Sequence, residues 1–160
     1  MKLTIVCLLI ATSVCLAENT NITIVANGSP VLGLTVPQSA TVTTKEEKTE
    51  IKTKEMTLYI WAIPTAKTVD EGAAQIPNVI AREVVQFVAT TTNTITVVGA
   101  PAKHLMGRAV EADDYDPGTA DVVVFTTGKA IFAACVHGEA NDAVREREPM
   151  LSVLKTAKAP

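Results

Sequence analysis

Two uninterrupted apolar runs, at residues 122–125 and 131–136, constrain the fold more than any other part of this 160-residue sequence. Their sequences, VVVF and IFAACV, lack the apolar–polar alternation of a strand that has one solvent-exposed face. Continuous runs of this length are typical of strands that are buried on both faces of a sheet. We therefore expect a sheet that is covered on each side, and a chain of this length with 48% hydrophobic residues can supply such a core.

Seven further runs rich in β-branched residues precede these two. Gly, Pro and Asn turn residues bound most of them, which indicates strands joined by short connections. The runs lie at residues 22–26, 31–36, 40–44, 49–54, 56–63, 94–99 and 102–112. The pattern predicts an α+β fold, in which an antiparallel sheet of about six or seven strands is sandwiched between helices.

Two segments have a helical period instead. Residues 68–71 fit a capping box, and apolar residues then recur every three or four positions, which predicts a helix over residues 68–89. Pro77 lies inside this segment, so we expect a kink or a restart of the helix there. A second helix is expected over residues 141–157, where Pro149 either interrupts the helix or marks its start.

Residues 1–17 have the composition of a secretory signal peptide. One lysine precedes an apolar run over residues 3–16, and Ala17 supplies the small residue that a signal peptidase requires. We expect cleavage near Ala17 and a single mature domain over residues 18–160 that is secreted or periplasmic, without stable membrane insertion. A retained anchor is the alternative, although the run is shorter than the roughly 20 residues of a spanning helix. The valine before the second cysteine disfavours a lipoprotein.

Charge and cysteine content exclude several classes of partner. The chain has 14 Lys and Arg against 17 Asp and Glu, so it lacks the excess of positive charge that neutralises phosphates, and we expect no nucleic acid. Removal of the signal leaves Cys135 alone of the three cysteines, which excludes an internal disulfide. The sequence has no glycine-rich phosphate loop, nucleophile elbow or clear metal-ligand spacing, and we expect no cofactor.

The order of the expected elements resembles a known fold. Strands, a helix, four strands and a closing helix follow one another, with the turn Gly-Ala-Pro-Ala at residues 99–102 and the closing sequence LSVLKT at residues 151–156. Over residues 31–157 this order is similar to the PsbP-like fold. That fold is shared by PsbP of photosystem II, the Ran-binding nuclear import factor and DcrB-like bacterial envelope proteins. The resemblance implies a binding or assembly module and carries over no catalytic residue.

Cys135 and His137 are candidates for a catalytic pair, because residues two apart on a strand project from the same face. Cys135, however, lies in an apolar run that disfavours a thiolate, so we interpret the two as a buried thiol and a histidine at the exit of a strand. A redox role or an intermolecular disulfide is the alternative. His137 and Glu139 remain an alternative metal site, to which Asp142 or His104 could add ligands, although zinc requires three or four.

The segment over residues 111–121 concentrates acidic side chains around a Pro-Gly turn, with Asp113, Asp114 and Asp116 at its centre. The spacing of Asp114 and Asp116 is similar to the start of an EF-hand loop, but Phe125 stands at the twelfth position, where a bidentate Glu is required. We interpret the segment as a solvated hairpin tip. Weak divalent-cation binding and an acidic patch for a basic partner are the alternatives.

Tyr59 and Trp61 share one face of the strand expected over residues 56–63. Tyr and Trp are favoured at interfaces, so the two form an exposed aromatic pair if this face has no helix above it. If the sheet is covered on both sides, the same two side chains belong to the core.

We therefore expect an exported, non-catalytic protein of the bacterial cell envelope that binds another protein or supports an assembly. Tyr59, Trp61 and the acidic segment are its candidate surfaces for a protein partner in the envelope. One alternative is a carrier of a small apolar ligand, which requires a sizeable apolar cavity between helices and sheet. The other is an enzyme or metal-dependent site built on Cys135, His137 and Glu139.

Overall fold

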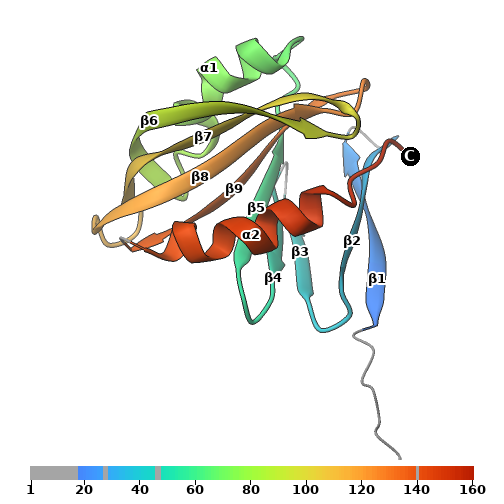
Figure 1. The fold of residues 1–160 in the computed structure, drawn as a ribbon, viewed down its shortest axis with the longest axis horizontal. Coiled ribbons are helices and arrows are strands. Elements are labelled where there is room, and N and C mark those ends of the chain that lie inside the picture. Colours follow the sequence, from blue (N-terminus) through green and yellow to red (C-terminus); the bar gives the residue numbers. More distant parts are fainter. Residues whose placement is uncertain (1–17, 27–28, 46–47, 140) are drawn as a thin grey trace, which may run out of the picture.

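A seven-stranded antiparallel sheet between two helices forms the body of the molecule (Figure 1). The computed structural model describes residues 18–26, 29–45, 48–139 and 141–160. The strand order in the sheet is β3-β4-β5-β9-β8-β7-β6, and β1 and β2 form a separate hairpin. In chain order the elements are β1 (Asn19–Ala26), β2 (Ser29–Pro37), β3 (Thr41–Lys45), β4 (Lys48–Lys52), β5 (Thr57–Ala62), α1 (Val69–Val79), β6 (Val84–Val97), β7 (Ala100–Glu111), β8 (Pro117–Thr126), β9 (Ile131–Glu139) and α2 (Asp142–Leu154). The predicted α+β class and strand number are confirmed.

The two apolar runs form β8 and β9, which are neighbours in the sheet, and every residue of both runs is buried. Their side chains alternate between two cores. Val123 and Phe132 pack in the core that includes α2, whereas Val124 and Ala133 pack in the core that includes α1. The expectation that both faces of the sheet are covered is therefore confirmed.

Helix α1 begins at the predicted cap and approaches the sheet closely. The N–H of Glu71 donates to Thr68 Oγ1 at 3.1 Å, which satisfies one of the free amides of the first turn. A Cβ at Gly72 would lie 2.7 Å from Ile131 Cγ2 and 3.0 Å from Val124 Cγ1. Only a residue without a side chain therefore lets the helix lie at this distance from β8 and β9.

Helix α1 is shorter than the periodicity of the sequence predicted. It ends at Val79, and β6 begins at Val84, so the prediction of a helix to residue 89 was wrong. Val84 and Phe87 are buried from a strand, and their spacing continues the helical period only by coincidence. Pro77 lies in the last turn of α1 and no restart follows it, while α2 continues through Pro149 instead of starting there.

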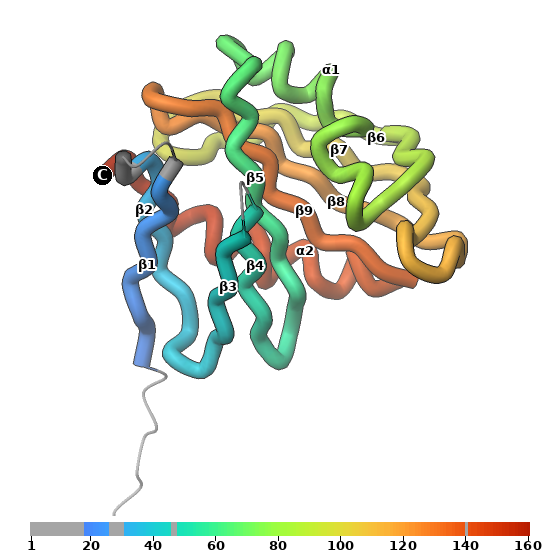
Figure 2. The backbone as a smooth tube through the Cα atoms, turned by 180° about the vertical axis from the view of Figure 1, so that it is seen from behind, coloured from blue at the N-terminus to red at the C-terminus, as the bar shows by residue number. Residues whose placement is uncertain are grey.

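The β1-β2 hairpin lies outside the main sheet and closes the core beneath α2. Leu32, Leu34 and Val36 of β2 are buried in the core that includes α2. The C-terminal segment pairs with the other edge of β2, because the N–H groups of Gly33 and Lys158 donate to each other's carbonyl oxygens at 2.9 and 3.0 Å. Figures 1 and 2 both show the hairpin beside the chain that leaves α2.

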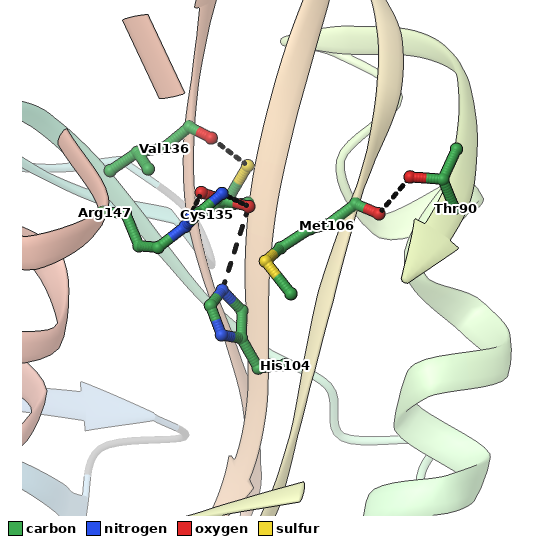
Figure 3. Close-up of polar contacts among 7 residues, drawn as sticks. Thr90, His104, Met106, Cys135, Val136 and Arg147 are labelled. Atoms are coloured by element: carbon green, nitrogen blue, oxygen red, sulfur yellow. Dashed lines mark hydrogen bonds and ion pairs between the residues drawn. The ribbon is translucent and has the colours of Figure 1, made fainter. Parts of the chain in front are cut away.

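An ion pair beneath α2 fixes this helix on the sheet. Arg147 donates to both carboxylate oxygens of Asp121 on β8, at 2.7 Å from Nε and 3.3 Å from Nη2. The Asp121 side chain is 2% exposed, and the Arg147 side chain is 30% exposed. His104 approaches the same carboxylate from β7, with Nε2 at 3.8 Å from Asp121 Oδ1 (Figure 3). Burial lowers the pKa of His104, and Arg147 adds to this effect while Asp121 opposes it.

Arg147→Met is expected to destabilise the fold strongly, because it leaves the carboxylate of Asp121 buried without a partner. Removal of one member of a buried ion pair costs about 3–5 kcal/mol, and the partial exposure of Arg147 places this case at the lower end. Arg147→Met/Asp121→Asn should recover most of the lost free energy of unfolding, which chemical denaturation measures. A double variant no more stable than Arg147→Met would contradict this account.

The free energy of unfolding should fall as the pH drops below about 6.5, the ordinary pKa of histidine. Unfolded His104 binds a proton in this range, whereas the folded protein resists protonation because its His104 pKa is lowered. His104→Asn should therefore lose less stability than the parent between about pH 7 and about pH 5. Burial raises the pKa of Glu146, which acts in the opposite direction, but both proteins keep this residue. Denaturation curves across this range test the prediction, and equal pH slopes would contradict it.

Candidate functional site

Cys135 is a buried thiol rather than a nucleophile. It is fully buried in the core that includes α1, and its Sγ makes a weak hydrogen bond to the carbonyl oxygen of Val136 at 3.6 Å (Figure 3). Burial raises the pKa of the thiol, and nearby carboxylates, among them Asp121 and Glu83, add to the effect. The thiol is therefore protonated at neutral pH and shielded from solutes, and neither property suits a nucleophile.

His137 projects from the same face of β9 as Cys135 but is held by other neighbours. Its Nδ1 lies 3.0 Å from Glu111 Oε1, and its ring stacks on Tyr59 with centroids 5.2 Å apart and an interplanar angle of 18°. Its Nε2 is buried and has no hydrogen-bond partner among the described residues. These contacts orient the imidazole toward Glu111 and Tyr59, so Cys135 and His137 do not form a nucleophile–base pair.

The other residues considered for a catalytic or metal site are dispersed. Glu139 is exposed at the last position of β9, and Asp142 forms an ion pair with Arg145 at 2.5 Å. His104 lies on the opposite face of the sheet, since its partner in the β7-β8 register is Val123, which belongs to the core that includes α2. In the part of the chain that the structure describes, no three His, Cys, Asp or Glu residues converge so as to hold a metal ion.

The acidic segment divides into an exposed tip and two buried or half-buried ends. Asp113, Asp114 and Asp116 are exposed in the β7-β8 turn, where the N–H of Asp116 donates to Asp114 Oδ1 at 3.1 Å. Glu111 and Asp121, at the two ends, each lie on a strand and pair with a basic side chain. The prediction of a solvated tip that includes these two ends was therefore wrong, because Glu111 is half-buried beside His137 and Asp121 is buried beneath α2.

Tyr59 and Trp61 lie on the α1 side of β5, with ring centroids 5.8 Å apart. Trp61 is 7% exposed and Tyr59 is half-buried, so the pair belongs to the core and not to an exposed surface. Lys48 Nζ lies 4.9 Å from the centroid of the Tyr59 ring and also pairs with Glu83. Burial, with the negative charges of Glu83 and Glu50, raises the pKa of the Tyr59 phenol.

Trp61 also forms part of the wall of an open hollow of about 710 Å³, which lies between α1 and the ends of β3, β4 and β5. We call it the Trp61 hollow. Its lining residues are Lys45, Lys48, Trp61, Ala62, Ile63, Pro64, Thr65, Gln75, Asn78, Val79 and Arg82.

The lining of the Trp61 hollow combines apolar side chains with a few polar groups. Trp61, Ile63 and Val79 supply apolar surface, while Gln75 and Asn78 supply amide groups. The described residues of the lining include no carboxylate, imidazole or thiol. An apolar wall with a few convergent polar groups is typical of a binding site.

Sequence reasoning placed Trp61 on a strand but did not find the hollow. Gln75, Asn78 and Val79 line the same hollow as Trp61 only because α1 lies beside the end of β5 in the folded chain. The available signal was their spacing of three and four residues, which places all three on one helical face. That signal says nothing about which strand the face meets.

Comparisons with known proteins identify the fold of this chain but no sequence family. No family sequence model matches the chain, and neither does any curated protein sequence. No helix within the described residues combines the length and the hydrophobicity needed to cross a membrane.

Several solved structures are similar to this chain, among them those of LpqN and a cyanobacterial PsbP. LpqN, described as involved in cell envelope biogenesis of Mycobacterium tuberculosis, gives a TM-score of 0.47 at 15% identity over 89% of this chain and 90% of its own. Cyanobacterial PsbP (CyanoP) from Synechocystis sp. PCC 6803 gives a TM-score of 0.53 at 10% identity over 92% of this chain and 96% of its own. The match to CyanoP spans nearly all of both chains and shows that this chain has the PsbP-like α+β fold.

Proposed function

We propose that this chain is an exported, non-catalytic protein of the bacterial cell envelope, which binds another protein or supports an assembly through the Trp61 hollow. The observation that carries the proposal is the lining of the hollow, which joins an aromatic wall to amide and ammonium groups. Export is supported by the apolar run over residues 3–16, which is followed by Ala17. The burial of Cys135 and the pairing of His137 with Glu111 support a non-catalytic role.

The polar and apolar groups that line the hollow suit the binding of a short segment of a partner protein. Lys45, Thr65 and Asn78 are exposed at the hollow, where they can reach polar groups of a bound segment. Amides such as those of Gln75 and Asn78 both donate and accept, as the backbone of an extended segment requires. Trp61 and Ile63 lie behind them as the apolar wall of the hollow, to which Trp61 contributes the small part of its ring that is not buried.

A small-ligand carrier is the second candidate, because the volume of about 710 Å³ lies within the range of roughly 300–1,000 Å³ found for small-molecule sites. The mixed lining favours a ligand with polar groups over a wholly apolar one. Native mass spectrometry of the chain purified from the envelope tests this candidate. A bound small molecule that is lost in Asn78→Tyr, which fills the hollow, would favour the carrier over the protein-binding module.

A photoreactive amino acid at position 78 should form covalent adducts with an envelope protein in living cells, because Asn78 is exposed and lines the hollow. The matched control is position 52, since Lys52 is exposed on β4 but does not line the Trp61 hollow. Adducts should form at position 78 and not at position 52. Adducts at neither position, or at both alike, would contradict a protein-binding role for the hollow.

Cys135→Ser should leave the adducts at position 78 unchanged, because the thiol is buried away from the hollow and takes no part in binding. The substitution places a hydroxyl in an apolar site and should lower the free energy of unfolding by about 1–3 kcal/mol. Chemical denaturation and the same crosslinking experiment measure the two effects. A folded Cys135→Ser protein without adducts would show that the thiol has a functional role.

A further inference from the structure

Strand β6 is the outer edge of the seven-stranded sheet, and its outer side has no partner strand. Its inner side pairs with β7 from Val84 to Val97. In Figure 1 β6 lies on the near side of the sheet, and Figure 2 places it on the far side, as expected for an outermost strand. Among the described residues, positions 85–97 form no backbone–backbone hydrogen bond outside this ladder. Their outward N–H and C=O groups are therefore available to another strand.

The composition of β6 leaves this edge open to pairing. Its 14 residues, VVQFVATTTNTITV, include no charged residue and no proline. Lysine, proline and short length are the usual devices that protect an edge strand from pairing. Residues 88–94 are all exposed. The opposite edge strand, β3, has five residues and carries Lys45, so it is the better protected of the two edges.

The second half of β6 has the regular geometry that pairing requires. The β6-β7 register shifts between Val85 and Val88 and again between Ala89 and Thr91. Such bulges bend and twist a strand and disfavour pairing on its other side. From Thr91 to Val97 the register is regular, so these seven consecutive residues form an edge without a bulge.

We propose that two copies of this chain associate through antiparallel pairing of residues 91–97, which joins their sheets into one. A two-fold axis brings each strand against its own reversed sequence, so any charge near the axis meets its own copy. β6 has no such charge. With the axis at Thr94, the centre of the paired segment, Thr92 faces Thr96 of the second copy, and cross-strand threonine pairs stabilise a sheet. This self-complementarity favours a second copy as the occupant over an unrelated strand, and the proposal is independent of the Trp61 hollow.

The association should be reversible and insensitive to salt. Pairing of seven residues along one edge buries less than the roughly 1,000 Å² of a stable interface, so monomer and dimer should exchange. No charged residue lies in the paired segment, so ionic strength should change the dissociation constant little.

Sedimentation velocity of the exported chain over a range of concentrations and salt tests the proposal. Wild type should show a monomer–dimer equilibrium, which Thr92→Lys/Thr96→Lys should weaken about tenfold or more by placing like charges near the axis. The matched control, Thr41→Lys/Thr43→Lys, makes the same change on two exposed residues of β3 and should behave as wild type. A wild-type chain that stays monomeric, a dimer that survives in the β6 variant, or equal weakening in both variants would overturn the proposal.

A cysteine scan locates the axis without depending on the stability of the lysine variants. Single cysteines at positions 91 to 95 are exposed to oxidised glutathione, while Cys135 is buried and does not compete. Only a residue near the two-fold axis faces its own copy, so disulfide-linked dimers should peak at one position or at two adjacent ones. Equal yields at all five positions, or a comparable yield from the control Thr43→Cys, would overturn the proposed pairing.

Discussion

Burial of β8 and β9 on both faces is the constraint on which the rest of the structure depends. Neither face of these two strands is polar enough to be exposed to solvent, so each face of the sheet must be covered by another element. Helix α1 covers one face and can approach because Gly72 has no side chain. Helix α2 covers the other face together with the β1-β2 hairpin. The two helices are thus consequences of two apolar runs that lie in neighbouring strands.

Asp121 is the exception within this apolar centre, and it determines how α2 lies. A carboxylate at this depth requires a charged partner, and Arg147 reaches it from α2 with two hydrogen bonds. Apolar side chains tolerate small shifts of a helix along a sheet, whereas a two-point contact between a guanidinium and a carboxylate does not. The apolar core therefore supplies the attraction between α2 and the sheet, and the ion pair selects one alignment.

The fold class could be predicted because strand signals are local. Each strand carries its own run of β-branched residues and its own turn residues, and the capping residues of α1 lie beside it in the sequence. The end of α1 could not be predicted in this way, since Val84 and Phe87 satisfy the helical spacing equally well from a strand. Asp121 was grouped with the acidic turn because its sequence neighbours are acidic, while its partner lies 26 residues away. The Trp61 hollow depends on α1 lying beside the end of β5, which no local pattern encodes.

The pairing of Gly33 with Lys158 has a consequence for the order in which the chain can fold. The hairpin that emerges early from the ribosome needs residues 156–158 to complete its edge, since Thr156 and Lys158 both bond to β2. In the main sheet, β5 likewise cannot complete its pairing until β9 is made, about seventy residues further along the chain. Contacts of such long range are slow to form. A nascent chain with this topology stays incompletely folded until its synthesis is nearly finished, which is the condition a protein must meet to be threaded through a translocation pore.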